Sequence, residues 1–259
     1  MKLFLDIGNT RLKWCLESNE TLHYGVSGND NWSEMENEIA AHIKNQSLMT
    51  ICVASVASDK VEQQVRKWSA EKYSLEPEFV SVIKDFGGLK TCYFDVSRLG
   101  VDRWLAMLAG FHECHNAFIV IDAGSAITID YVSQRGKHMG GMIYPGIHML
   151  KECLSTRTSK VKFESLTLPR IWKPGCDTFT CVGAGLSGAL EGLLYKAINY
   201  STVEFEALEN TNGVVFLTGG DAGLIGQWCP IPYKEDRHLV LKGIKLWHKL
   251  LHESKQESK

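Results

Sequence analysis

Two segments of the sequence place an aspartate, a glycine and a small polar residue directly after an apolar run. They read Leu3-Phe4-Leu5-Asp6-Ile7-Gly8-Asn9-Thr10 and Ile119-Val120-Ile121-Asp122-Ala123-Gly124-Ser125-Ala126. A second apolar stretch follows each one, so each segment predicts a β-hairpin whose turn carries a carboxylate. Because the same plan occurs twice, we expect two similar domains, residues 1–115 and residues 116–259.

A turn of this composition suits a phosphate group and a metal ion. Gly8 lets the backbone approach a ligand closely. Asn9 and Thr10 provide uncharged donors for phosphate oxygens, Asp6 can hold a hydrated Mg²⁺, and Lys13 can add a positive charge. One such turn alone is better explained as an ordinary hairpin with Asp6 bonded to its own backbone. Two of them, each opening a domain, favour a phosphate and metal site in a cleft between the domains.

Two further segments have both a chemical and a structural explanation. Gly219 and Gly220 follow a buried strand, so their backbone can receive the nucleoside end of a nucleotide, although strand–Gly-Gly–helix turns are also common for packing reasons. Asp102 and Arg103 stand at the start of an amphipathic helix. Asp102 can simply cap that helix, or it can accept a proton from a hydroxyl while Arg103 or the helix amides bind an anion. Both explanations stay open here.

These groups need an α/β scaffold to position them. Strands are predicted at Leu3–Leu5, Arg11–Leu16, Thr50–Ala54, Phe118–Ile121, Ala126–Val132 and Val214–Thr218. Helices are predicted at Trp32–Lys44, Val61–Lys72, Val101–His112, Gly146–Ser155, Thr180–Tyr200 and Leu239–His252. The mixture indicates helices that cover the faces of a sheet.

Composition and motifs exclude several classes of protein. The 259 residues carry a net charge of −2, which gives no broad basic field for nucleic acid or for a membrane surface. The first residues are too short an apolar run for a signal peptide. No P-loop occurs, and the Gly-x-Gly-x-x-Gly spacing at Gly183–Gly188 lies inside a predicted helix instead of following a strand, so it is not a dinucleotide-binding fingerprint. The eight scattered cysteines indicate reduced thiols and a cytoplasmic protein. His112-Glu113-Cys114-His115 lacks a second ligand pair, so a solvated helix end explains it better than a metal site.

The ordered motifs resemble those of the type III pantothenate kinases over roughly the whole chain. The matching segments are Asp6–Thr10, Leu99–Arg103, Val120–Asp130, Gly140–Gly146 and Thr218–Ala222. This resemblance implies two ribonuclease-H-like domains of the acetate and sugar kinase/Hsp70/actin superfamily, with a nucleotide between them. It also implies transfer of the γ-phosphoryl group of ATP to pantothenate, the first step towards coenzyme A.

The resemblance assigns roles to individual positions. For ATP and Mg²⁺ it implies Asp6, Ile7, Gly8, Asn9, Thr10, Arg11, Leu12, Lys13 and Ser125. For pantothenate it implies Tyr93, Gly100, Val101, Asp102, Arg103 and Thr178. Within these sets, Asp102 is the expected general base, and Thr178 often reaches the substrate from the partner subunit of a homodimer. Asp122 is the expected ligand of a monovalent cation, K⁺ or NH₄⁺.

The sequence departs from the family pattern at two positions of the site. Ser125 replaces the usual Thr but keeps its hydroxyl, and Val96 replaces a frequent Pro. Two other functions also have to be considered. One is a kinase of the same superfamily that acts on another small alcohol, and the other is a nucleotide-binding accessory or regulatory protein without catalysis.

Overall fold

The computed structural model describes residues 1–257 except 20, 30, 44–45, 159–167 and 210–212. The chain forms two compact units. Unit 1 consists of Met1–Ala109 and His238–Lys259, and unit 2 consists of Gly110–Arg237. Each unit is built on its own five-stranded sheet.

Unit 1 has the sheet order β3-β2-β1-β4-β5. Its strands are β1 (Lys2–Ile7), β2 (Arg11–Ser18), β3 (Thr21–Gly28), β4 (Thr50–Ser55) and β5 (Glu78–Phe79), with a separate β6 (Asp85–Phe86) and β7 (Leu89–Lys90) ribbon. Its helices are α1 (Trp32–Ile43), α2 (Asp59–Tyr73), the short 3₁₀ turn η1 (Val96–Arg98), α3 (Val101–Glu113), which continues into unit 2, and α7 (Leu239–Glu257). The central strand β1 is antiparallel to β2 and parallel to β4.

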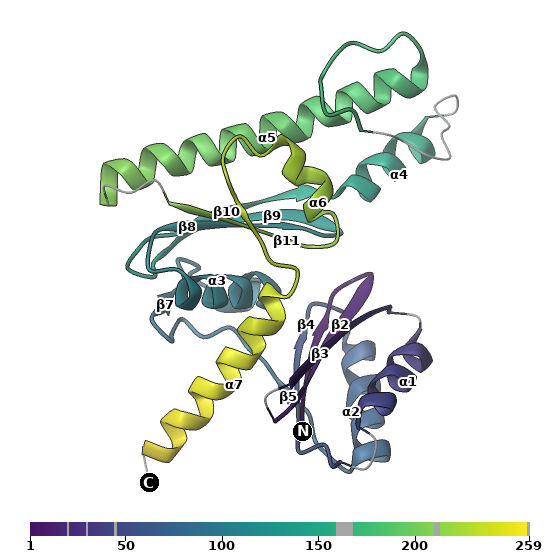
Figure 1. Ribbon diagram of the computed structural model, residues 1–259, viewed down its shortest axis with the longest axis vertical. Helices are drawn as coiled ribbons and strands as arrows, with labels where there is room; N and C mark the ends of the chain where they lie inside the picture. Colours follow the sequence, from purple (N-terminus) through teal and green to yellow (C-terminus); the bar gives the residue numbers. More distant parts are fainter. Residues whose placement is uncertain (20, 30, 44–45, 159–167, 210–212, 258–259) are drawn as a thin grey trace. The chain divides into compact units, whose positions relative to one another are not determined.

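The two faces of the unit 1 sheet carry different side chains, because successive residues of a strand point to opposite sides. Leu3, Leu5 and Ile7 belong to a buried core that includes Met35 of α1 and Val65 of α2. Figure 1 shows α1 and α2 on one side of this sheet. The other face carries Phe4 and its register partners Cys15 and Cys52, and the ring of Phe4 meets His248 of α7 edge-on at 6.1 Å.

Unit 2 has the sheet order β10-β9-β8-β11-β12. Its strands are β8 (Phe118–Ala123), β9 (Ala126–Val132), β10 (His138–Pro145), β11 (Val214–Thr218) and β12 (Lys234–Glu235). Its helices are α4 (Ile147–Arg157), α5 (Thr178–Glu209), α6 (Ala222–Ile225) and the 3₁₀ turn η2 (Gly226–Trp228). The central strand β8 is antiparallel to β9 and parallel to β11. This pairing repeats that of unit 1, so the repeat seen in the sequence corresponds to two sheets of the same topology.

The long helix α5 covers one face of the unit 2 sheet (Figure 1). Leu190 and Leu194 of α5 lie in one buried cluster with Ile119 and Ile121 of β8 and Val215 of β11. Burial of such aliphatic side chains is the main stabilising contribution in a layered α/β unit. The strand ends that carry Asp122 and Thr218 are thereby held in place.

All predicted strands and helices are present within the described residues, and Lys44, the expected end of the first helix, lies outside them. The division of the chain differs from the expected domains 1–115 and 116–259 in two respects. The boundary falls inside α3, and α7 belongs to unit 1. The physical reason is that α7 packs against β1, β2 and β4 and covers the Phe4 face of their sheet. Among the described residues, no helix is both long enough and apolar enough to cross a membrane.

Candidate functional site

The β1–β2 turn of unit 1 is closed by its backbone. The N–H of Gly8 donates to the Arg11 carbonyl at 3.0 Å, and a Cβ at Gly8 would lie 3.3 Å from that oxygen. Asp6 stands near the end of β1 and is 9% exposed, opposite Lys13 of β2. Asn9 and Thr10 are exposed at the tip. The structure therefore presents the predicted carboxylate, amine and polar turn residues on one hairpin.

Two of the residues expected to bind ATP have their side chains in the core. Ile7 and Leu12 are 0% and 1% exposed and lie in the apolar cluster of unit 1. Only their backbone groups can contact a phosphate. Sequence reasoning missed Asn29, whose side-chain amide donates to the Gly8 carbonyl and whose N–H donates to the Thr10 carbonyl at 3.2 Å. Asn29 follows β3 and fixes the turn from a neighbouring strand.

The β8–β9 turn of unit 2 follows the same plan. The N–H of Gly124 donates to the Ala126 carbonyl at 3.0 Å, and the N–H of Gly146 donates to the Ser125 carbonyl at 3.1 Å. Asp122 is half-buried, while Ser125 is exposed at the turn. In register with Asp122 stand Thr128 of β9 and Thr218 of β11.

Gly219 brings a third strand end against Asp122. It has φ +96°, and a Cβ there would lie 2.4 Å from the Ala123 carbonyl oxygen and 2.5 Å from Asp122 Oδ1. Only glycine combines this backbone conformation with such a close approach. From the sequence, the Gly219-Gly220 turn and Asp122 were expected to belong to separate sites. In the structure, Gly219 lies directly against Asp122.

Thr218 is a second residue that sequence reasoning missed. Its hydroxyl is buried and has no hydrogen-bond partner among the described residues, and the whole side chain is 1% exposed. Buried hydroxyls are normally paired, so this one is suited to a ligand at the strand ends. In the sequence, Thr218 could have been recognised only as the one polar residue at the end of an apolar strand.

The start of α3 holds the carboxylate of Asp102 in a fixed position. Asp102 Oδ1 accepts from the N–H of Arg103 at 2.8 Å, and Gly100 accepts from the N–H of Trp104 at 3.1 Å. A Cβ at residue 100 would lie 2.5 Å from Asp102 Oδ1. Gly100 therefore leaves the space into which this carboxylate folds. The capping contact and a chemical role are compatible, because a carboxylate has two oxygens.

Tyr93 and Arg103, ten residues apart, meet in unit 1. Arg103 Nη1 donates to the Tyr93 hydroxyl at 3.2 Å, and its guanidinium carbon lies 5.9 Å from the centre of the tyrosine ring. Arg103 is only 7% exposed. A cavity of about 560 Å³ lies beside Gly100 and Val101, and its wall includes Arg98 and several serines. Tyr93, Asp102 and Arg103 do not line this cavity.

Thr178 begins α5 and is exposed on unit 2. The preceding residue, Asp177, caps this helix: its Oδ1 accepts from the N–H of Thr180 at 2.9 Å. Hydrogen bonds from Thr180 lower the pKa of Asp177 below its usual value.

His112 and His115, the histidines for which a solvated helix end was preferred to a metal site, are both exposed. They belong to no metal-ligand group among the residues that the structure describes.

Comparison with known proteins identifies the family. The model of the type III pantothenate kinase family matches residues 2–200. A type III pantothenate kinase of Teredinibacter turnerae is 38% identical over 245 residues, which cover 94% of this chain and 97% of the relative. One from Alcanivorax borkumensis is 33% identical over 94% of this chain and 97% of the relative. The chain belongs to the type III pantothenate kinase family.

Solved structures support the fold of this kinase family. A protein from Campylobacter jejuni described as a Baf family transcriptional activator has a TM-score of 0.59 at 22% identity, over 98% of this chain and 99% of its own. A Sinorhizobium meliloti protein described as a 2-dehydro-3-deoxygalactonokinase has a TM-score of 0.56 at 10% identity, over 96% of each chain. At these identities the likeness shows the fold alone, which is the expected actin-like ATPase and sugar kinase fold.

Proposed function

We propose that this chain transfers the γ-phosphoryl group of ATP to the primary hydroxyl of pantothenate, giving 4′-phosphopantothenate for coenzyme A synthesis, with the residue roles given below. The observation that carries the proposal is the family match over residues 2–200. That range includes the β1–β2 turn, the start of α3, the β8–β9 turn and Thr178. Phosphoryl transfer depends mainly on positioning and on charge stabilisation, which are what turns of this type provide.

The β1–β2 turn is the proposed site of the ATP phosphates. Asn9, Thr10 and Arg11 are exposed there and donate to phosphate oxygens together with the turn amides. The donor set fits Mg²⁺, because this ion is usually held by one or two carboxylates plus substrate phosphates, and Asp6 supplies a carboxylate near the strand end. When it is bound with ATP, Mg²⁺ would neutralise part of the negative charge of the phosphates. Lys13 adds a positive charge beside Asp6.

Asp102 is the proposed general base. It orients the primary hydroxyl of pantothenate and takes its proton, while the hydroxyl oxygen bonds to the γ-phosphorus and the bond to the ADP oxygen breaks. Its position is fixed by the N–H of Arg103. Arg103 and Tyr93 bind pantothenate as one hydrogen-bonded pair. The cavity beside Gly100, with Arg98 in its wall, suits the carboxylate end of this substrate because a guanidinium binds carboxylates well.

Asp122 is the proposed ligand of K⁺ or NH₄⁺. The surroundings fit such an ion, because the nearby donors are oxygens: the Asp122 carboxylate, the Ala123 carbonyl and the buried Thr218 hydroxyl. Oxygen donors replace the hydration shell of a monovalent cation. The absent side chain at Gly219 leaves the required space. Ser125 is a second phosphate contact, and Gly219 and Gly220 take the adenine end of the nucleotide.

A homodimer is the proposed assembly, with α5 at its interface and Thr178 reaching the partner's substrate. One face of α5 exposes Gly185, Ala189 and Gly192, where nothing lies within 4 Å of a Cβ built on either glycine. Further along, Tyr195 and Val203 are 62% and 56% exposed. Small residues allow close helix contact, and exposed apolar groups gain from burial.

Light scattering at micromolar concentration should give the mass of a dimer for the wild type and the mass of a monomer for Ala189→Arg. A wild-type monomer contradicts the assembly.

We place the reaction in the cytoplasm. The support is that all eight cysteines are free thiols, the state that a reducing compartment maintains.

A coupled assay with ATP, Mg²⁺, K⁺ and pantothenate tests the reaction. Asp102→Asn should lower kcat by about 10²–10⁴-fold, the usual contribution of a general base. Activity of that variant within a few-fold of the wild type would remove the assignment. A panel of other small alcohols tests the rival kinase activity, and ATP binding without any turnover would support the accessory role instead.

A further inference from the structure

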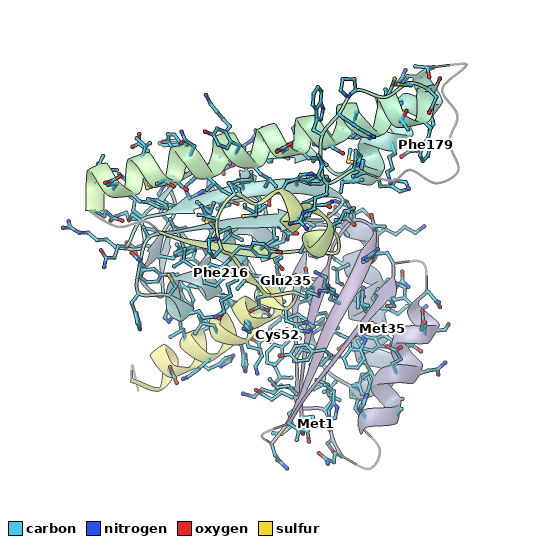
Figure 2. The ribbon with its side chains drawn as sticks, turned by 45° about the horizontal axis from the view of Figure 1, so that its top comes forward. Met1, Met35, Cys52, Phe179, Phe216 and Glu235 are labelled. Carbon is cyan, nitrogen blue, oxygen red and sulfur yellow. The ribbon has the colours of Figure 1, made fainter. Side chains whose placement is uncertain are left out.

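Three potential metal ligands from distant parts of the sequence meet in unit 1, outside every segment assigned to the kinase reaction. Cys52 lies on β4, Glu78 on β5 and His248 on α7. Their ligand atoms, a sulfur, a carboxylate oxygen and an imidazole nitrogen, all lie within 4.8 Å of one another. Figure 2 labels Cys52 on its strand.

The fold places these side chains on one face of the sheet. Cys52 and Glu78 are register partners on the parallel strands β4 and β5, so both side chains leave the sheet on the same side. Helix α7 packs against β4, and its His248 also meets Phe4, the register partner of Cys52 on β1. The cluster is therefore set by the same packing that assigns α7 to unit 1.

Burial leaves one nitrogen of this cluster without a hydrogen bond. Cys52 is 0% and His248 is 7% exposed. His248 Nδ1 is buried and has no hydrogen-bond partner among the described residues, and it lies 4.0 Å from Glu78 Oε2. A buried ring nitrogen that is left unpaired costs free energy. A cation between this nitrogen and the carboxylate would give the nitrogen a partner.

A further histidine fixes the carboxylate. His252 lies four residues after His248, on the same side of α7, and its Nε2 is 3.2 Å from Glu78 Oε2. The two imidazole rings are 4.3 Å apart. Carboxylates that bind metals are themselves usually held by a hydrogen bond of this kind.

We propose that Cys52, Glu78 and His248 bind a zinc ion, with His252 as a positioning residue for Glu78. Sulfur, nitrogen and oxygen donors together are typical of zinc. Three protein ligands leave the fourth tetrahedral position to water. Zinc bonds of about 2.0–2.3 Å require the donors to move closer together. The Glu78 carboxylate has two oxygens, so one can bind the ion while the other stays with His252.

Burial raises the pKa of the Cys52 thiol, so the ion has to displace the thiol proton. On binding, the Cys52 thiol releases its proton to solvent, and the thiolate and the Glu78 carboxylate together balance the charge of the ion. A cavity of about 600 Å³ reaches His248 from solvent, and its lining also includes Phe4 and four lysines, Lys2, Lys242, Lys245 and Lys249. The ion joins α7 to β4 and β5, so binding stabilises unit 1.

The test uses the full chain, kept reduced and freed of metal by a chelator. Calorimetric titration with Zn²⁺ should give one tight equivalent, and Zn²⁺ should raise the Tm. Co²⁺ in place of Zn²⁺ should give a thiolate-to-cobalt charge-transfer absorption band. Glu78→Gln and His248→Gln should each weaken Zn²⁺ binding by more than about 100-fold, and His252→Asn by about 10–100-fold, the range for residues that support a ligand.

Cys15→Ala is the matched control for Cys52→Ala. Both thiols are 0% exposed, and both are register partners of Phe4, one on β2 and the other on β4. Cys52→Ala should lose the cobalt–thiolate band and Cys15→Ala should keep it. If Cys52→Ala fails to fold, the surface-accessible Glu78→Gln decides. The proposal is overturned if the wild type takes up no tight equivalent, or if Glu78→Gln binds Zn²⁺ as the wild type does.

Discussion

The two hairpins that share one sequence plan are completed differently in the two units. The β1–β2 turn of unit 1 exposes Asn9 and Thr10 and is held by the side chain of Asn29. The β8–β9 turn of unit 2 is enclosed on one side, because the backbone of Gly219 lies against Asp122 and the N–H of Gly146 donates to the Ser125 carbonyl, while the Ser125 side chain stays exposed. An open turn with exposed donors suits a large anion. A half-buried carboxylate near the Ala123 carbonyl and the Thr218 hydroxyl suits a small cation. The two hairpins thus keep the same aspartate but suit different ligands, because different residues surround each turn.

Asp6→Asn should have the largest effect of the substitutions that compare the two turns. It removes the carboxylate proposed for Mg²⁺ beside the phosphates, and the loss of one group that stabilises charge in the transition state costs about 10²–10³ in kcat. Steady-state kinetics with Mg²⁺-ATP measures this. Asp59→Asn, at the exposed start of α2 in the same unit, is the control and should be neutral. An Asp6→Asn enzyme with wild-type kcat would contradict the role of the open turn.

Asp122→Asn should act through the monovalent cation instead. In the wild type we expect K⁺ to raise kcat/KM relative to Na⁺ by about 5–150-fold, the range of coupling between two binding sites. The variant should show the same rate in both salts. If the wild type itself does not distinguish K⁺ from Na⁺, the enclosed turn does not bind this cation.

The losses of unfolding free energy caused by Gly219→Ala and by Gly8→Ala test how tightly each turn is packed. A Cβ at residue 219 meets backbone at 2.4 Å and requires φ +96°, so this variant should lose about 1–3 kcal/mol of unfolding free energy. At residue 8 the nearest atom is 3.3 Å away and φ is not positive, and the loss should stay below about 1 kcal/mol. Urea unfolding measures both. Equal losses would mean that the two turns are equally enclosed.

Asn29→Ala should have the smallest effect. It removes the hydrogen bond to the Gly8 carbonyl, worth about 0.5–1.5 kcal/mol. We expect a rise of a few-fold in KM for ATP, with an unchanged response to K⁺, because only the open turn loosens. A change in the K⁺ response would show that Asn29 also affects the enclosed turn.

The buried elements of the fold were predictable from the sequence, and the edge strands were not. Periodicity identified β1, β4, β8 and β11 because their apolar residues face a core. It missed β3 and β10, each at one edge of its sheet, and also the two-residue strands β5 and β12 at the opposite edges. β10 contains two glycines and a register shift between His138 and Gly140, and much of it is exposed. Strands without a buried face give no alternating pattern.

The site was predictable where neighbouring residues form it and not where separate segments meet. The two turns and the start of α3 are local in sequence, and their chemistry follows from residue type. Two contacts depend on which strands are neighbours in the sheets. Gly219 lies against Asp122, and the Asn29 side chain donates a hydrogen bond to the Gly8 carbonyl. The same applies to α7, whose amphipathic pattern predicts a helix on a sheet but does not specify which sheet. The cluster of Cys52, Glu78 and His248 was missed for this reason.

The return of α7 to the first sheet also has a consequence for protein synthesis. Unit 2, Gly110–Arg237, is a contiguous stretch and can fold while translation continues, since domains generally fold as units during synthesis. The strands of unit 1 emerge from the ribosome first, yet the face that carries Phe4, Cys15 and Cys52 stays uncovered until Leu239–Glu257 has been made. The half of the enzyme that is translated first therefore cannot complete its packing until the last helix has been made.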